Sequence, residues 1–122
     1  WNNLAQLIAN KRYCNDVLFE SDNHADLSDP AYQQFATRYA ELYKKKPSKN
    51  TLYGYDTAKL VLDLIREGGA TREALMNGLT MVQDFHGQHS KIGFSDKRVN
   101  TWVWILRYSD DQVQKVDEFN VK

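Results

Sequence analysis

The sequence has one cysteine, no net charge and no long apolar run, and each of these absences excludes something. Cys14 is the only cysteine, so no disulfide can form within the chain, and we expect a small buried apolar residue there. Lysine and arginine together number 16, as do aspartate and glutamate, so the basic excess that binds a nucleic-acid backbone is missing. No stretch approaches the roughly 20 apolar residues of a membrane-spanning helix.

What is present fits one domain of ordinary size. The chain has 122 residues, of which 42% are hydrophobic and 26% charged, which is neither a disordered nor a membrane-spanning composition. We therefore expect a small molecule or a protein as partner, and no nucleic acid. The chain opens on Trp1 rather than methionine, so we expect the natural N-terminus elsewhere, and a missing signal peptide says nothing about location.

The first third of the chain predicts a short helix, a strand and a loop. Leu4, Leu7 and Ile8 stand at helical spacing, which predicts a short amphipathic helix over residues 2–10. Residues 17–19 form a brief apolar run between polar residues, as in a buried strand. The polar residues 21–28 that follow predict a loop.

A strong helix is expected to begin at Asp29 and Pro30. Asp29 can accept hydrogen bonds from free backbone N–H groups, and Pro30 suits the first helical position. The apolar stripe that follows consists of Tyr32, Phe35, Ala36, Tyr39, Leu42 and Tyr43. Lysines 44–46 complement the negative end of the helix dipole, and Pro47 ends the helix. We interpret the lysines as a solvated helix end rather than a nucleic-acid patch.

Two more helices are predicted after it. Apolar residues cover a wide arc between residues 52 and 66, which predicts a mostly buried helix that Gly68-Gly69 ends. Thr71 is the expected N-cap of a third helix. The period then changes to that of strands and turns. The pattern predicts, in order, a turn at 85–87, a strand at 91–94, a turn at 95–100, a strand at 101–108, a turn at 109–112 and a return strand at 113–119.

No catalytic or metal-binding pattern stands out. His86 and His89 are three residues apart in a glycine-containing segment, and we interpret both as solvated loop histidines, as we do His24. Asp63 and Glu67 share a helix face with Arg66 beside them, which favours a solvated face over an acid–base pair. We therefore expect no catalytic residue, no metal and no cofactor.

One aromatic residue lies outside the apolar stripes. Tyr53 precedes Gly54 near the start of the second helix. An aromatic side chain at a helix N-terminus can form the wall of a ligand cleft, and simple packing is the alternative reading of the same position.

Two blocks of sequence together resemble a known family. The first runs from Tyr32-Gln33-Gln34-Phe35 through Arg38-Tyr39 and Tyr43 to Pro47, and then to Tyr53-Gly54-Tyr55-Asp56-Thr57-Ala58-Lys59-Leu60. The second is Phe85-His86-Gly87, then Lys91-Ile92-Gly93-Phe94, then a hairpin that begins with residues 103–106. In order and spacing they resemble the type I periplasmic binding proteins, and among them the leucine/isoleucine/valine-binding proteins. Thr57 departs from the usual alanine, and His89 and Gly93 shift the glycine pattern.

The resemblance implies an α/β fold, with two three-layer, flavodoxin-like lobes joined by three crossing segments. This chain would be the C-terminal part, with helices in its middle and a C-terminal β-hairpin. Residues 1–18 would end the second lobe, residues 24–92 would supply first-lobe helices, and residues 100–122 would form the second-lobe hairpin. The crossings would fall at 19–23 and 94–99. They make Glu20, Ser21, Ser95 and Asp96 the expected hinge residues.

The function that the resemblance implies is that of an extracytoplasmic solute-binding component of an ABC-type transporter. It would bind an amino acid or similar small polar ligand between its lobes and deliver it to a membrane permease, as a periplasmic protein or extracytoplasmic lipoprotein. Tyr53, with Leu52 beside it, is the expected cleft wall. Asp56 is expected to be a cap or salt-bridge partner rather than a ligand contact.

Other readings remain beside this one. Some proteins with this fold are lipoprotein regulators of cell-wall synthesis, which use it as a protein-binding scaffold. An enzyme of flavodoxin-like architecture is disfavoured because no nucleophile, base or phosphate loop is visible. In either lobe-based reading the helices lack their covering sheets. We therefore expect the chain to associate with itself or with the missing part of its protein.

Overall fold

The computed structural model describes residues 4–94 and 98–121, and it is a mixed α/β structure with helices in the middle and a β-hairpin at the end. The helices are α1 (Leu4–Ala9), α2 (Lys11–Cys14), α3 (Pro30–Tyr43), α4 (Lys49–Gly68) and α5 (Arg72–Met81). The strands are β1 (Val17–Ser21), β2 (Phe85–His86), β3 (Lys91–Ile92), β4 (Trp102–Ser109) and β5 (Gln112–Asn120). The predicted α/β class is confirmed.

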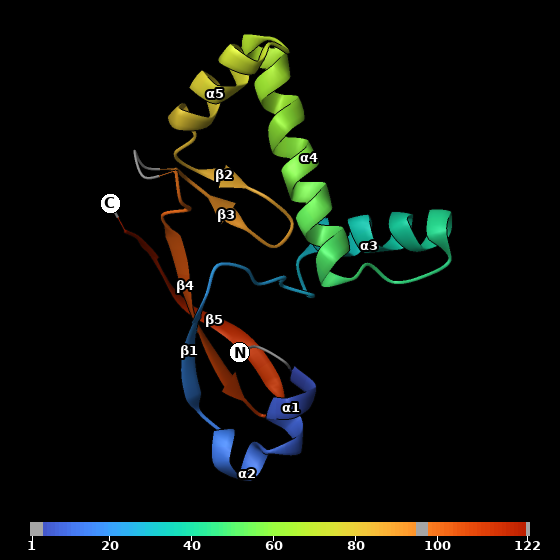
Figure 1. The fold of residues 1–122 in the computed structure, drawn as a ribbon. Helices are drawn as coiled ribbons and strands as arrows, with labels where there is room; N and C mark the ends of the chain where they lie inside the picture. Colours follow the sequence, from blue (N-terminus) through green and yellow to red (C-terminus); the bar gives the residue numbers. More distant parts are fainter. Residues whose placement is uncertain (1–3, 95–97, 122) are drawn as a thin grey trace.

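The elements gather into two regions that long strands connect (Figure 1). The sheet region holds the three-stranded antiparallel sheet, in the order β1-β4-β5, with α1 and α2 at its far end. The helical region holds α4, α5 and the short hairpin β2-β3. Leu106 and Tyr108 of β4 are fully buried. Cys14 in α2 is half-buried rather than enclosed as predicted, because α2 lies at the edge of this region.

The hairpin β4-β5 carries a β-bulge. Ile105 pairs with Asp117, but its neighbour Leu106 pairs with Lys115. Val116 is therefore an extra residue on β5 with no partner in the register. A bulge bends its strand and increases the local twist. In this chain it lies close to the point where the strands leave the sheet region.

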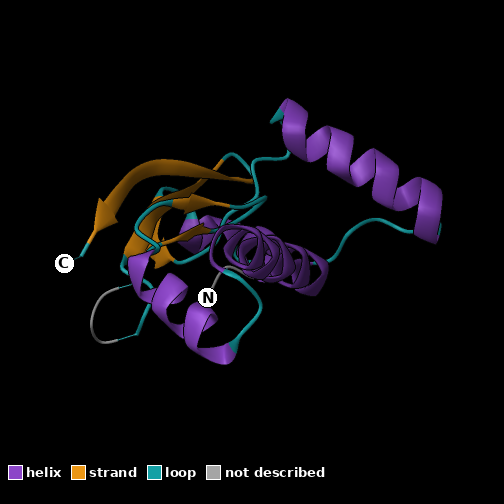
Figure 2. Ribbon diagram, turned by 90° about the horizontal axis from the view of Figure 1, so that it is seen from above, coloured by secondary structure: helices purple, strands orange, loops and turns teal. Residues whose placement is uncertain are grey.

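The predicted start of α3 is confirmed at the atomic level. The Asp29 side chain accepts a hydrogen bond from the backbone N–H of Ala31 at 2.8 Å, and Pro30 follows as the first helical residue. Lys44 ends the helix in the left-handed conformation, with φ at 56°. This helix stands clear of the other elements, at the right of both Figure 1 and Figure 2. It contacts α4 through an aromatic pair, since the ring centres of Phe35 and Tyr55 lie 4.6 Å apart.

Helix α4 differs from the helix predicted between residues 52 and 66, both in where it starts and in how much of it is buried. It begins at Lys49 rather than near residue 52, because Ser48 and Thr51 form a capping box that the sequence reading overlooked. Only Leu52, Asp56 and Leu60 are buried, on one stripe. The opposite face is exposed because no described element covers it, so the expectation of a mostly buried helix is wrong. Gly69 at the C-cap and Thr71 at the next N-cap are where the sequence predicted them.

The segment predicted as a turn at residues 85–87 is partly a strand. Phe85 pairs with Ile92 and His86 with Lys91, so the turn comes later, at residues 87–90. The predicted strand at residues 91–94 is shorter, since Lys91–Ile92 alone form β3. The hairpin is stabilised from outside its own ladder, by contacts with α4 and with the segment before β4.

Candidate functional site

The most informative place in the molecule is where three strands run side by side between the two regions. Ser21 of β1 pairs with Trp104 of β4, and Trp104 pairs in turn with Glu118 of β5. We call this row the crossing. In the described chain α4 and α5 make at most weak contacts with the sheet. The crossing and the side chains around it therefore hold the two regions together.

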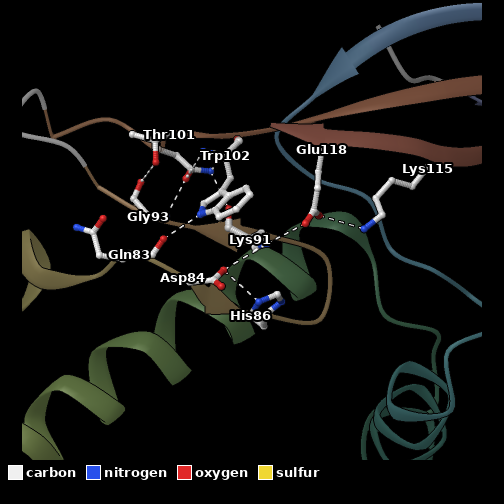
Figure 3. Close-up of polar contacts among 10 residues, drawn as sticks. Gln83, Asp84, His86, Lys91, Gly93, Thr101, Trp102, Lys115 and Glu118 are labelled. Atoms are coloured by element: carbon white, nitrogen blue, oxygen red, sulfur yellow. Dashed lines mark hydrogen bonds and ion pairs between the residues drawn. The ribbon is translucent and has the colours of Figure 1, made fainter. Parts of the chain in front are cut away.

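Lys91 is the central side chain beside the crossing (Figure 3). Its Nζ lies 2.9 Å from Oε1 of Glu118 and 3.4 Å from Oδ1 of Asp84. The same ammonium lies 3.4 Å from the centre of the Trp102 ring. Only 8% of this side chain is exposed. Burial alone would lower the pKa of Lys91, but the two carboxylates outweigh it and raise that pKa above its usual range.

Glu118 bridges two lysines. Its Oε1 accepts from Lys91, and its Oε2 accepts from Nζ of Lys115 at 3.1 Å. Lys115 in turn lies 5.5 Å from the centre of the Trp104 ring. The hydrogen bonds from Lys91 and Lys115 lower the pKa of Glu118 to about 2. The carboxylate is therefore ionised at neutral pH and joined to both lysines.

Asn100 closes the segment that leads from the hairpin into β4. Its amide nitrogen donates to the carbonyl of Lys91 at 2.9 Å, and its amide oxygen accepts from the N–H groups of Gly93 and Trp102. The Trp102 indole donates to the carbonyl of Gln83 at 2.9 Å (Figure 3). Gly93 has no room for a side chain, since a Cβ there would overlap the Gln83 carbonyl. These contacts fix the start of β4 on the helical region.

A second cluster surrounds Asp56, which is only 1% exposed. Its carboxylate accepts from the backbone N–H of Gln88 at 2.6 Å, from Oγ of Ser90 at 2.7 Å and from Nδ1 of His89 at 2.6 Å. Burial would raise the pKa of Asp56, but these donors outweigh it and lower that pKa. Because an ionised carboxylate only accepts, we assign a hydrogen to His89 Nδ1.

This cluster corrects one prediction about the histidines and refines another about Asp56. His89 is buried, at 3% exposure, rather than a solvated loop residue, because the turn at residues 87–90 folds onto α4. Asp56 is held by hydrogen bonds, from His89 and Ser90 among others, and it lies in the middle of α4 rather than near its start. His86 is solvated as predicted, with its side chain 67% exposed.

The segment that follows β1 is bound to this cluster. Asn23 is buried, and its side-chain nitrogen donates to the Tyr53 hydroxyl at 2.6 Å. The backbone of Asn23 forms a bridge with Ser90, and the N–H of His24 donates to the His89 carbonyl at 2.7 Å. The Tyr53 and His89 rings meet at 83°, with centres 4.4 Å apart. The segment after β1 is therefore tied to α4 and to the hairpin turn.

The residues expected to form the site lie in different environments. Tyr53 is 36% exposed beside Asn23, whereas Leu52 is 6% exposed and packs in the core. Glu20 and Ser21 are the last residues of β1 and reach the crossing. Ser95 and Asp96 lie outside the described residues. Phe94, just before that gap, pairs across it with Asn100.

The polar contacts of the described residues anchor segments of the chain to one another. Within residues 4–94 and 98–121, no three histidine, cysteine, aspartate or glutamate side chains come together as a metal site. In the same residues, no helix is long and apolar enough to span a membrane. Asp63 pairs with Lys59 at 2.7 Å and with Arg66 at 3.6 Å on the surface of α4, as a solvated helix face does.

Sequence reasoning missed Lys91, Asn100 and Glu118. Lys91 read as part of an ordinary strand, and Glu118 as one of several charges on the return strand. The lone signal was the aromatic excess around Trp102 and Trp104, which read as core. Lysines come to lie over these indole rings only through strand pairing across the sheet, which a single sequence does not show.

The comparisons with known proteins agree with this architecture. Over residues 4–112 the chain matches the model of a family described as periplasmic binding protein, and the chain therefore belongs to the periplasmic binding protein family. This confirms the resemblance seen in the sequence. The family is one of solute-binding proteins rather than enzymes, and membership implies an extracytoplasmic location. A comparison with curated proteins gave no match.

Three solved structures share the fold. A leucine binding protein from Thermotoga maritima is 22% identical with a TM-score of 0.60, and the matched region covers 96% of this chain and 34% of that protein. A putative branched-chain amino acid ABC transporter from Rhodospirillum rubrum is 18% identical with a TM-score of 0.70, covering 93% and 34%. An ABC transporter substrate-binding protein from Desulfitobacterium hafniense, in complex with Leu, is 19% identical with a TM-score of 0.58, covering 84% and 32%. The chain thus spans about a third of the length of each.

Proposed function

We propose that this chain is part of a solute-binding protein of an ABC-type transporter, which traps an amino acid or similar small polar ligand between two lobes. The observation that carries the proposal is the family match over residues 4–112. Its fold neighbours include a leucine binding protein and a substrate-binding protein in complex with Leu. The partner that would receive the ligand is a membrane permease. Binding is a population shift toward a closed form, without a chemical step.

The arrangement of the chain supports an assignment of its parts to the lobes. The helical region, within residues 24–92, would belong to the first lobe. The segments before residue 18 and after residue 100 would belong to the second. Under this assignment the crossing of Ser21, Trp104 and Glu118 is the hinge. Glu20 and Ser21 remain proposed hinge residues, as do Ser95 and Asp96.

Tyr53 is our proposed cleft wall in this chain. Its ring is part-exposed, and its hydroxyl is held by Asn23 from the segment that leaves the hinge. Leu52 would support it from the core rather than contact the ligand, because it is buried. If the ring lines the cleft, Tyr53→Ala should weaken ligand binding roughly tenfold, about 1.4 kcal/mol. Tyr53→Phe should weaken binding less, and unchanged affinity in Tyr53→Ala would remove Tyr53 from the site.

The test of the function is a thermal-shift screen of the full-length protein against the common amino acids and small carboxylates. A ligand that binds only the folded state raises the melting temperature. We expect a rise with one class of ligand, leucine and its aliphatic relatives first, and isothermal titration calorimetry would then give the affinity.

A flat panel would count against the transporter role. The protein would then be better explained as a protein-binding scaffold, of the kind that regulates cell-wall synthesis. A pull-down with membrane permeases and with cell-wall synthases as separate baits would distinguish the two partners.

A further inference from the structure

The crossing is bridged by a line of alternating charges on one face of the sheet. Lys91 belongs to the helical region through β3, and Glu118 and Lys115 belong to β5. The carboxylate of Glu118 lies between the two ammonium groups, at 2.9 Å from Lys91 and 3.1 Å from Lys115. Figure 3 shows the three side chains in a row beside Trp102. The row therefore connects the helical region to the sheet region independently of the backbone ladder.

The aromatic side chains beneath this row favour its position. Trp102 and Trp104 are two residues apart on β4, so their side chains lie on the same face of the strand. Each indole has a lysine over it, Lys91 at 3.4 Å and Lys115 at 5.5 Å from the ring centres. A lysine over an indole face is attracted by the negative ring surface. The indole rings thus add cation–π attraction to the ion pairs that Glu118 makes with both lysines.

Lys91 is the member whose removal should matter most. It is 8% exposed, whereas 46% of the Lys115 side chain is exposed. Exposed ion pairs contribute little, whereas the ammonium of Lys91 is desolvated and is a partner that Glu118 and Asp84 share. Asp84 adds a second carboxylate to Lys91 from the helical side. Lys91 therefore joins carboxylates from both regions.

The bulge makes this connection mechanically significant. Val116 is the unpaired residue between Lys115 and Glu118 on β5, so β5 is bent between these two charged residues. Bulges disrupt the ladder locally. The backbone ladder between β4 and β5 is therefore interrupted where the Lys115–Glu118 ion pair spans it.

We propose that Lys91, Glu118 and Lys115, seated on Trp102 and Trp104, form a latch that holds one relative orientation of the two regions and so sets the balance between open and closed forms. This inference rests on the proposed two-lobed function. The charged groups of the latch bind one another, so we expect the latch to change ligand affinity through the orientation of the regions rather than through contact.

The test measures orientation directly in the full-length protein. Spin labels at Gln6→Cys in α1 and Glu73→Cys in α5, in a background without other cysteines, report the distance between the regions by pulsed electron paramagnetic resonance. The wild type should give one narrow distance population. Lys91→Met and Glu118→Gln should each add a second population above about 10% of the molecules. Glu118→Gln keeps the side-chain shape and carries the test if Lys91→Met does not fold.

Lys59→Met is the matched control. Lys59 also pairs with a carboxylate, Asp63 at 2.7 Å, and lies over an aromatic ring, Phe85 at 4.9 Å. All three residues belong to the helical region, so this variant should leave the distance unchanged. Lys91→Arg keeps a cation over Trp102 and should behave as the wild type.

Affinity for leucine, measured on the same proteins, separates the latch from the function. We expect Lys91→Met to change the leucine Kd about fivefold or more, and Lys59→Met to leave it unchanged. Leucine binding with wild-type distances in both latch variants would overturn the latch and leave the function standing. Altered distances with no ligand bound from the whole panel would support the latch and overturn the proposed function.

Discussion

The carboxylate of Asp56 occupies the space that a side chain at Gly87 would need, because a Cβ on Gly87 would overlap both carboxylate oxygens. The two residues come from the two sequence blocks that resemble the family. The helix block supplies the acceptor, and the hairpin block supplies the turn that wraps around it. The resemblance is therefore carried by two segments that meet in one contact.

Replacing Gly87 tests this contact. Gly87→Ala should destabilise the full-length protein by about 1–3 kcal/mol, because a methyl group there must displace a carboxylate that holds three or more hydrogen bonds. Denaturant unfolding would measure the change. Gly54→Ala is the control, since nothing lies within 4 Å of its Cβ position in α4. It should stabilise the protein by up to about 1 kcal/mol. Equal effects of the two substitutions would contradict the overlap.

Removing the charge of Asp56 should unfasten the turn at residues 87–90. Asp56→Asn places an amide N–H₂ against groups that are themselves donors, those of Gln88, His89 and Ser90. We expect a loss of about 2–4 kcal/mol, measured by chemical denaturation. Hydrogen exchange at the N–H of Gln88 should rise with it. Asp63→Asn, in an exposed pair with Lys59, should remain close to the wild type.

Glu118 should make the protein sensitive to acid. Its folded pKa of about 2 lies below the ordinary value of 4.5. Its contribution to stability is therefore complete above pH 4.5 and is lost as the pH falls toward 2. Glu118→Gln should lose less stability than the wild type over this range in urea unfolding at a series of pH values. Parallel curves for the two proteins would show that Glu118 is not paired in solution as described.

The isolated chain should associate with itself. Leu42 of α3, Leu62 of α4 and Met81 of α5 are 67%, 58% and 78% exposed, and large exposed apolar faces drive association. Light scattering on the 122-residue chain should show species larger than the monomer. The double substitution Leu42→Lys and Leu62→Lys should reduce them. A chain that stays monomeric at all concentrations would show that these faces need no partner.

Local patterns predicted most of the elements because their signals are local. Asp29, Thr71 and Gly69 cap helices through contacts within a few residues, so the sequence displays them. The capping box of Ser48 and Thr51 was equally local and was overlooked. The predicted burial of α4 was wrong for a different reason. An apolar arc shows which face of a helix would pack against another element, but not whether that element belongs to this chain.

The site depended on contacts far apart in the sequence. His89 read as a solvated loop residue because its partner, Asp56, lies on another element. Lys91 and Glu118 meet only when β3 and β5 come together. Asp56 was predicted to be a cap or salt-bridge partner from its place near the start of its helix, and that position does not name the partners on the hairpin turn.

The pairing of β1 with β4 has a consequence for how the protein folds. Val17 pairs with Tyr108, and Ser21 with Trp104. Strand β1 therefore pairs with β4, which is synthesised only after helices α3, α4 and α5. Such non-local pairing slows folding, because a long loop must close before any contact rewards it. Until β4 is made, β1 lacks the partner strand that it has in this sheet. A chain that ends before residue 100 should therefore lack the whole β1–β4 pairing.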